Sequence, residues 1–375
     1  MNTSVTSSAL RAANRRRVLY AVYQNKEISK QGLAQNLGIS LPTVTQNLHE
    51  WETIGLVERK GLYESTGGRK AHIYRFVATA HVAIGIVLLK DFYRIVAVDL
   101  YGEVLQSSEI SQPFIRNSTF FYEMGKNINE FIERLHFDPD RILGVCIALQ
   151  GLVSSDGNTV IYGEILNCTG LTLDEIKVNI QYPCTLIHDT EASATAELWA
   201  QKDLKDAVLL SLTRNFGGAL ITNGTVHRGL ELSSGIIEHM CLYPHGRPCY
   251  CGKHGCIEAY CSAYALQCDA GEPLELFFES LRAGDDRRLK IWHTYLQNLA
   301  IAINNIRMVL DSEYVIGGYL LRFMNDDDFA QLSEYAEKEC PFQSSGIHIK
   351  RSVYLDDAAA PGAAISLVKN FWDKL

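Results

Sequence analysis

One histidine and three cysteines have the residue types and the spacing of a metal site. Cys249, Cys251 and Cys256 lie within eight residues, with two glycines among them, and His239 lies ten residues before Cys249. A thiol-rich set of four ligands with one imidazole is what tetrahedral Zn²⁺ prefers. Free or disulfide-linked thiols are the alternative. We therefore predict a structural Zn²⁺ site formed by these four residues.

The chain contains ten cysteines but no sign of export. Arg15, Arg16 and Arg17 are not followed by a long apolar stretch, so no secretory signal is predicted, and no apolar run reaches the ~18 residues of a membrane span. A reducing cytoplasm is the expected location, where clustered thiols indicate metal binding or catalysis more often than disulfides. Seven scattered cysteines are expected to be packing residues: Cys146, Cys168, Cys184, Cys241, Cys261, Cys268 and Cys340.

Charge is divided unevenly along the 375 residues, a length that suggests two or three domains. Residues 1–80 hold 11 Lys and Arg against 5 Asp and Glu, and the rest holds 24 against 38, so the formal charges are +6 and −14. A basic segment on an acidic body suggests a module that binds a polyanion.

Three helices are expected before residue 55. The first covers residues 8–24, the second runs from Lys30 to Leu37 between a Ser29 cap and Gly38, and the third begins after Ser40. On the third helix, apolar residues at i, i+4 and i+7 face inward, and the opposite side carries small polar side chains. The inward residues are Val44, Leu48 and Trp51, and the polar ones are Thr43, Thr45, Gln46, Asn47 and His49.

Two alternating segments follow this helix pair. Residues 55–60 and 71–76 predict strands around a Ser65-Thr-Gly-Gly-Arg-Lys tip, which completes a winged helix-turn-helix. Such a third helix fits the major groove of operator DNA, and the tip arginine fits a narrow minor groove. A winged helix that binds protein is the alternative. The expected DNA contacts are Thr43, Thr45, Gln46, Asn47, His49, Arg69 and Lys70.

The remaining residues, 79–375, alternate between strand and helix patterns, which predicts an α/β fold with two lobes. Strands are expected at 81–90, 92–100, 102–110, 142–149, 185–187, 207–213, 217–222 and 314–316, and helices at 118–135 and 190–202.

Four motifs give this body a specific resemblance. The cysteine knuckle, Asn215-Phe-Gly-Gly-Ala, Ile316-Gly-Gly and Pro361-Gly-Ala-Ala occur in the order typical of the ROK family of sugar kinases and sugar-responsive repressors. The resemblance implies an actin-like, ribonuclease-H-like two-lobed fold behind a repressor-type winged helix. The implied domains are residues 1–78, a first lobe at 79–200 rejoined by a helix at about 359–375, and a second lobe at 201–358.

The ATP-binding segment departs from the family pattern. ROK kinases have Asp-x-Gly-Gly-Thr where this chain reads Val87-Leu-Leu-Lys-Asp, so the aspartate is Val87 and the two glycines are Leu89 and Lys90. Side chains at those positions block close approach of the backbone to phosphate, on which phosphoryl transfer depends. No catalytic residue and no enzymatic activity are therefore expected.

The sugar site is partly retained in the resemblance. Asp189 matches the kinase base, its usual Asn neighbour is His188, and His239 matches a residue that both ligates zinc and contacts sugar. The family's Glu-x-Gly-His becomes Ile236-Ile-Glu-His, which argues against an ordinary hexose as the ligand. The expected ligand-binding residues are Asn167, His188, Asp189, His239 and Glu258.

These features together predict a repressor of carbohydrate metabolism genes. It would bind double-stranded operator DNA as a homodimer or dimer of dimers, respond to a sugar or sugar derivative, and have no membrane partner. Two alternatives remain open: a ROK sugar kinase with a fused regulatory domain, and a regulator whose body binds a protein partner.

Overall fold

The computed structural model describes residues 7–62, 72–341, 346–355 and 358–375. The chain forms two compact units. The N-terminal unit comprises residues up to 82 together with 99–103 and 370–375, and the body comprises 83–98 and 104–369. Among the described helices, none is long and apolar enough to cross a membrane.

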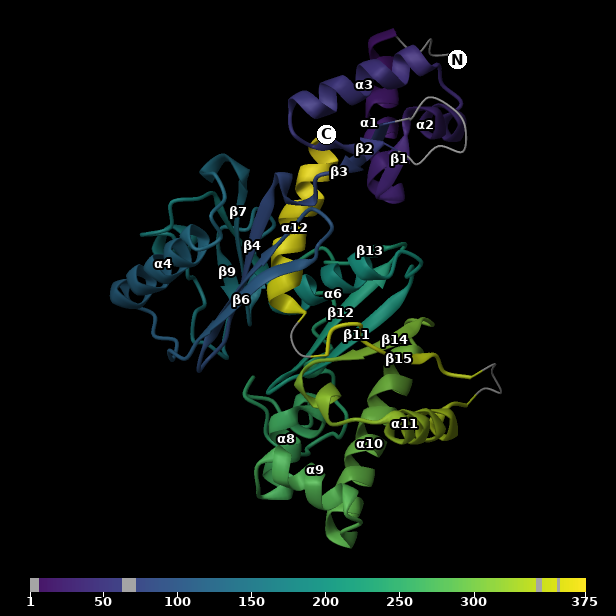
Figure 1. The fold of residues 1–375 in the computed structure, drawn as a ribbon. Helices are drawn as coiled ribbons and strands as arrows, with labels where there is room; N and C mark the ends of the chain where they lie inside the picture. The colour runs from purple at the N-terminus through teal and green to yellow at the C-terminus, as the bar shows by residue number, and fades with distance from the viewer. Residues whose placement is uncertain (1–6, 63–71, 342–345, 356–357) are drawn as a thin grey trace. The chain divides into compact units, whose positions relative to one another are not determined.

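The N-terminal unit contains three helices and a small antiparallel sheet in the order β1-β3-β2 (Figure 1). The Ser29 hydroxyl accepts a hydrogen bond from Gly32 N and caps α2, and Gly38 ends α2 with φ 64°. Ser40 caps α3 by accepting from Thr43 N. The predicted helix-turn-helix is therefore present, and the predicted wing tip with Arg69 and Lys70 lies outside the described residues. The elements are α1 (Ser7–Asn25), β1 (Glu27–Ser29), α2 (Lys30–Leu37), α3 (Leu41–Thr53), β2 (Val57–Leu62) and β3 (His72–Phe76).

Helix α3 presents its faces as predicted, with one exception. Val44, Leu48 and Trp51 are buried, and the Trp51 indole donates to the Arg15 carbonyl at 2.9 Å. Asn47 was expected on the exposed polar face, but it is only 4% exposed and donates to the Thr43 carbonyl. Its side chain satisfies the helix backbone because its position, three after Val44 and four before Trp51, turns it toward the packed side.

Four aromatic rings from three separate stretches of the chain form one cluster in the N-terminal unit. The Tyr23 ring stacks on Tyr101 at 4.5 Å and meets Trp372 at 4.8 Å, and Phe76 stacks on Trp372 at 5.5 Å between centroids. The Tyr101 hydroxyl also donates to the Tyr23 carbonyl at 3.0 Å. Such ring pairs stabilise beyond their buried area by ~0.5–1.5 kcal/mol each. Residues 99–103 and 370–375 therefore supply part of the unit's core.

The first sheet of the body has the order β10-β7-β4-β5-β6. Strands β4 to β6 form an antiparallel meander, and β7 pairs with β10 in parallel. Its elements are β4 (Val82–Leu88), β5 (Tyr93–Val98), β6 (Val104–Ile110), α4 (Ser118–Glu133), β7 (Ile142–Leu149), β10 (Cys184–His188) and α12 (Ala359–Lys374).

Helices α4 and α12 cover opposite faces of this sheet. Tyr93, which pairs with Leu88, accepts a hydrogen bond on its hydroxyl from Asn127 of α4 at 2.7 Å. Gly85 faces the other way, because it lies three residues from Leu88 along β4. A Cβ at Gly85 would lie 2.0 Å from the Ala360 carbonyl oxygen, so this glycine is what lets α12 approach the sheet.

The second sheet has the order β13-β12-β11-β14-β15 and is also covered on both faces. Along β11, Val208 and Leu210 pack into the large cluster that includes α10, and Leu209 packs into a smaller cluster with Ala194 of α6. Successive side chains of a strand point to opposite faces of the sheet, so both faces at β11 are packed against apolar residues. The elements are α6 (Asp189–Ala200), β11 (Ala207–Leu212), β12 (Phe216–Thr222), β13 (Thr225–Val226), α10 (Asp286–Arg307), β14 (Glu313–Gly317) and β15 (Ile349–Arg351).

Two mixed sheets, each in its own lobe of the body, confirm the predicted α/β class. Shorter elements complete the chain: η1 (Ala78–Ala80), η2 (Pro139–Arg141), β8 (Leu152–Val153), β9 (Val160–Tyr162), α5 (Leu173–Ile176), η3 (Ile237–His239), α7 (Glu258–Cys261), α8 (Ala263–Ala270), α9 (Leu274–Arg282), η4 (Tyr319–Arg322) and α11 (Asp326–Glu339).

Candidate functional site

The four predicted metal ligands converge in the folded body. The ligand atoms of His239, Cys249, Cys251 and Cys256 all lie within 4.8 Å of one another. Cys249 Sγ is 3.7 Å from His239 Nδ1, and Cys251 Sγ is 3.7 Å from Cys256 Sγ. Zn–S bonds of ~2.3 Å at tetrahedral angles place two sulfurs about 3.8 Å apart. The donor set and its spacing therefore fit Zn²⁺.

Glycine and backbone hydrogen bonds bring these ligands together. Gly252 and Gly255 have φ near 80°, which side-chain-bearing residues rarely adopt, and a Cβ at Gly255 would lie 1.8 Å from the Tyr243 carbonyl oxygen. Cys249 N donates to the Lys253 carbonyl at 2.8 Å and closes the tight turn between the first two cysteines and the third. The knuckle thus needs glycine at both positions.

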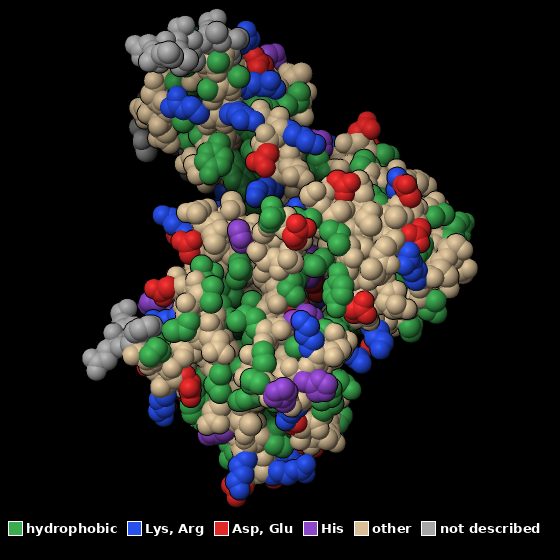
Figure 2. Space-filling view, turned by 180° about the vertical axis from the view of Figure 1, so that it is seen from behind, with side chains coloured by type: hydrophobic (Ala, Val, Ile, Leu, Met, Phe, Trp, Pro, Cys, Tyr) green, Lys and Arg blue, Asp and Glu red, His purple; other side chains and the backbone are tan. Residues whose placement is uncertain are grey.

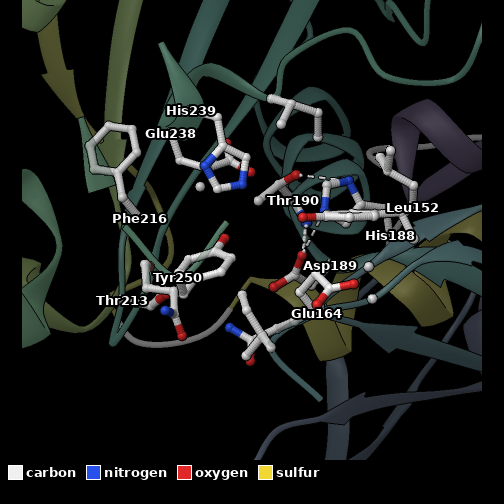
Figure 3. A pocket seen from close by; sticks show the side chains of 18 residues that line it. Leu152, Glu164, His188, Asp189, Thr190, Thr213, Phe216, Glu238, His239 and Tyr250 are labelled. Carbon is white, nitrogen blue, oxygen red and sulfur yellow. Dashed lines mark hydrogen bonds and ion pairs between the residues drawn. The ribbon is translucent and has the colours of Figure 1, made fainter. Parts of the chain in front are cut away.

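A pocket borders this cluster, because His239 belongs to the cluster and also lines the pocket (Figure 3). It holds about 560 Å³ of space, part of it open to solvent. His188, Asp189 and His239, three of the five predicted ligand residues, line it. The lining comes from the ends of β7, β9 and β10, the start of β12, helix η3 and the knuckle.

A short chain of polar contacts orients Asp189 at the start of α6. His188 Nε2 lies 3.2 Å from Asp189 Oδ1, and the Thr190 hydroxyl lies 3.2 Å from His188 Nδ1. Thr190 N also donates to Asp189 Oδ1 at 2.9 Å. These contacts use one carboxylate oxygen of Asp189 and leave Oδ2 available to accept a hydrogen bond from a ligand hydroxyl.

Burial sets the protonation of this pair. It lowers the pKa of His188 to about 4, so the imidazole is neutral near pH 7. It also raises the pKa of Asp189 to about 7, against the opposing effect of the Thr190 backbone hydrogen bond. A neutral His188 with its proton on Nε2 donates to Asp189 and accepts from Thr190, which matches the observed contacts.

The other two predicted ligand residues do not line the pocket. Asn167 is exposed, with φ 48°, and its N–H donates to the Glu164 carbonyl. Glu258 is 5% exposed, and its carboxylate accepts from Asn215 Nδ2 at 3.0 Å and from Phe216 N. Glu258 therefore fixes the loop that brings Asn215 to the pocket.

Several side chains that line the pocket were not among the predicted ligand residues, and they include Glu164, Glu238 and Tyr250. Tyr250 lies between two cysteines of the knuckle, and its ring meets the His239 ring edge-on at 5.1 Å (Figure 3). Its position between two predicted metal ligands was the available signal, because a residue flanked by two cysteines of one cluster has few directions open to its side chain. Glu164, on the loop after β9, had no comparable signal.

The glycine pair in β12 has a packing role. A Cβ at Gly217 would lie 2.6 Å from Thr190 Cγ2, and one at Gly218 would lie 2.2 Å from Ile237 Cγ1. These glycines let α6 and η3 approach β12 closely. They therefore bring Asp189 and His239 to the same pocket.

The segment that departs from the kinase pattern forms a closed hairpin turn. Leu89 N donates to the Phe92 carbonyl at 3.1 Å, so this N–H is not available to a phosphate. Leu89 and Lys90 line a larger cleft of about 1,750 Å³, part of it open to solvent. Asp91 in the same turn pairs with Arg214 of the second lobe at 2.9 Å. The Leu89 N–H and the Asp91 carboxylate of this turn are therefore both bonded within the protein.

The N-terminal unit presents a polar helix face and basic side chains. Thr45, Gln46 and His49 of α3 are exposed, and Thr43 is half-buried with its hydroxyl 2.8 Å from that of Ser40. Lys and Arg side chains gather on the face of this unit seen in Figure 2. Exposed basic residues of the unit include Arg11, Arg59, Lys60 and Arg75, each of which pairs with a glutamate of the same unit.

A two-lobed α/β body with a pocket beside a Cys₃His cluster, carried with a helix-turn-helix unit, defines a ROK-type regulator. Residues 84–370 match the ROK family, and the chain belongs to it.

Two regulators illustrate the similarity. The chain is 26% identical over 266 residues to the DNA-binding transcriptional dual regulator NagC of Escherichia coli, an alignment that covers 70% of this chain and 66% of the relative, just under two thirds of its length. It is 25% identical over 264 residues to the xylose repressor of Bacillus subtilis, covering 68% and 67%.

Solved structures share the fold. A ROK family transcriptional regulator described as a homologue of the E. coli MLC protein superposes with a TM-score of 0.77 at 23% identity, covering 97% of both chains. A ROK family glucokinase from Streptomyces griseus, solved with glucose and AMPPNP, gives 0.65 at 18% identity, covering 76% of this chain and 98% of the other.

Proposed function

We propose that this protein is a DNA-binding transcriptional repressor of carbohydrate metabolism genes that responds to a sugar or sugar derivative. One observation carries the proposal: a single chain combines an exposed polar helix face with a pocket in which His188, Asp189 and His239 converge. Its regulator relatives support the same assignment.

The DNA-binding surface is the exposed face of α3 with the wing. Gln46 suits bidentate pairing with adenine, and the methyl groups of Thr43 and Thr45 suit contact with thymine. His49, Arg69 and Lys70 complete the proposed set. Asn47 is left out of it because its side chain is buried and bonded to the helix backbone. A homodimer would present two such helices to the two halves of an operator.

Ligand binding occurs in the pocket of the body. Asp189 and His239 accept or donate hydrogen bonds to hydroxyl groups, and Glu258 acts by holding Asn215 in place. For the ligand to control DNA binding, it must bind the DNA-free state more tightly than the DNA-bound state. Release of operator DNA on ligand binding is the proposed response.

A structural Zn²⁺ would be held by His239, Cys249, Cys251 and Cys256, with all four positions filled by protein. It would fix the direction of His239 and Tyr250, which line the pocket. Zinc here shapes a binding site, and no chemical step is assigned to it.

Phosphoryl transfer is not part of the proposal. The Leu89 N–H is committed to the hairpin turn, and side chains occupy the positions of the phosphate-binding glycines.

The test selects DNA from a random double-stranded library with the purified full chain, then measures binding by fluorescence anisotropy. We expect a specific sequence that binds at physiological salt and weakens linearly in log salt, and a panel of hexoses, pentoses and amino sugars should contain one that releases it. Gln46→Ala should weaken binding, whereas the control Lys126→Ala on exposed α4 of the body should not. Failure to enrich any sequence would refute DNA-binding function, and release of ADP from ATP on addition of a sugar would identify a kinase.

A further inference from the structure

We propose that the pocket selects a sugar that carries a free amino group, and that Glu238 is the side chain that receives the ammonium. This inference rests on the proposed function in one respect: the pocket of the body must bind a sugar.

Glu238 is a buried carboxylate with unused bonding capacity. It is 8% exposed and lies in η3, immediately before His239. Among the described residues, its Oε2 is buried and has no hydrogen-bond partner. Leaving a buried carboxylate oxygen unpaired costs free energy that a bound donor would recover. The side chain also lines the pocket, so a ligand can reach it.

The rest of the lining has the charge pattern of a site for a cation. Asp189 and Glu164 line the same pocket, so three carboxylates surround one small volume. Within the described residues, this lining contains no lysine and no arginine. A ligand with a phosphate or carboxylate group would enter among three acidic side chains without a counter-charge. Burial raises the pKa of both Glu238 and Asp189, and a bound ammonium group would favour their ionised forms and gain charge-assisted hydrogen bonds.

Neighbouring side chains narrow the choice further. Ile236 lines the pocket close to Glu238 in the chain and offers only apolar contact. Tyr250 brings an aromatic ring to the same space, and aromatic faces attract cations (Figure 3). The free Oδ2 of Asp189 is suited to a hydroxyl. The combination of an ammonium acceptor, a hydroxyl acceptor and a ring favours an amino sugar over a simple polyol or a simple amine.

The geometry also explains how Glu238 is held without a partner of its own. Gly218 gives Ile237 room to pack against β12, and this contact fixes η3 on both sides of Glu238 together with His239 in the cysteine cluster. The Glu238 side chain is only 8% exposed, and this burial keeps it from solvent as a hydrogen-bond partner. It is preorganised to bind, which lowers the entropic cost of capturing a ligand.

The test is calorimetric titration of the full, zinc-loaded chain at pH 7 with four probes: glucosamine, N-acetylglucosamine, glucose and glucosamine 6-phosphate. The first two differ only in acetylation, which removes the positive charge, and the last adds negative charge. We expect glucosamine to bind about tenfold or more tightly than glucose or N-acetylglucosamine, since tenfold corresponds to ~1.4 kcal/mol. The phosphate ester should bind most weakly.

Glu238→Gln should remove the preference for glucosamine while glucose still binds. Its zinc content and melting temperature should stay at the wild-type values, which separates loss of the ammonium acceptor from damage to the adjacent cluster. Glu164→Gln is the matched control, because Glu164 is an exposed carboxylate in the same pocket and should affect the preference less.

Equal binding of glucose and glucosamine by the wild type, or an undiminished preference in Glu238→Gln, would overturn the inference. Binding of neutral sugars with no preference for an amine would overturn the inference while leaving the proposed function intact. Absence of binding by all four probes and by every sugar of the wider panel would overturn both this inference and the proposed sugar response, whereas DNA binding is tested separately.

Discussion

Replacing Gly362 with alanine sets two well-known effects against each other. Gly362 lies in helix α12, and alanine in place of glycine within a helix normally stabilises by ~1 kcal/mol. In this protein, however, a Cβ at position 362 would lie 1.8 Å from the carbonyl oxygen of Ala192 in α6. Real Cβ atoms essentially never lie closer than 3.0 Å to such an atom, so α12 and α6 must separate by at least 1.2 Å.

The packing effect should win. The obstructing atom belongs to the backbone and cannot rotate away, so the cost falls in the upper part of the ~1–3 kcal/mol seen for overpacked cores. After the helix-propensity gain of ~1 kcal/mol is subtracted, we expect Gly362→Ala to lower the free energy of unfolding by about 2 kcal/mol. Because Ala192 lies one turn after Asp189 in α6, the same displacement should weaken ligand binding in the pocket.

Urea denaturation followed by circular dichroism measures the first effect, and calorimetric titration with the bound sugar measures the second. The matched control is Asn370→Ala, an exposed change in the same helix that adds helix propensity without a clash and should be neutral or slightly stabilising. A Gly362→Ala protein that is more stable than the wild type would refute the close approach of α12 to α6.

Three further predictions concern the N-terminal unit and the pocket. Trp372→Ala should destabilise the N-terminal unit by roughly 1–3 kcal/mol, since it removes two aromatic pairs worth ~0.5–1.5 kcal/mol each. Operator affinity should fall with stability and recover when glycerol stabilises the variant. An affinity that glycerol does not restore would contradict this explanation. Gln46→Ala should weaken operator binding, measured by fluorescence anisotropy, by ~1–3 kcal/mol and leave the melting temperature unchanged. Asn47→Ala should instead lower the melting temperature, because its side chain is buried and bonded to the helix backbone. The reverse pattern would contradict the orientation of α3. The folded pKa of Asp189, about 7, is above its ordinary value, so the folded state keeps the proton to a higher pH than the unfolded chain does, and the ligand-free protein should lose up to ~1.4 kcal/mol of stability per pH unit as pH rises from about 4 to about 7. The difference in unfolding free energy between wild type and Asp189→Asn should show that slope. A difference that does not change with pH would refute the burial argument.

Local sequence signals predicted the helix-turn-helix elements and the convergence of His239 with the three cysteines well. Caps at Ser29 and Ser40 and the left-handed Gly38 fixed the two short helices, because each depends only on neighbouring residues. The cluster of His239 with the cysteines was equally visible, since ligand type and spacing describe it almost completely.

Features that depend on tertiary neighbours were harder to predict. Asn47 has a polar side chain on a helix edge, and only the packing of α3 decides whether it faces solvent or the backbone. Glu258 was expected at the ligand because of its position after the knuckle, yet its carboxylate serves Asn215 and Phe216 on a distant strand. The position of Glu238 in the pocket lining depends on which way η3 faces, which no periodicity in a three-residue helix can supply.

The aromatic cluster of the N-terminal unit also bears on how the protein matures during synthesis. Tyr23 and Phe76 leave the ribosome early, Tyr101 follows, and Trp372 emerges only after both lobes of the body have been translated. The unit that would read DNA therefore lacks part of its own core for most of translation. Nascent or prematurely terminated chains would compete poorly for operators, so a polypeptide would gain full DNA affinity only once the body had also been made.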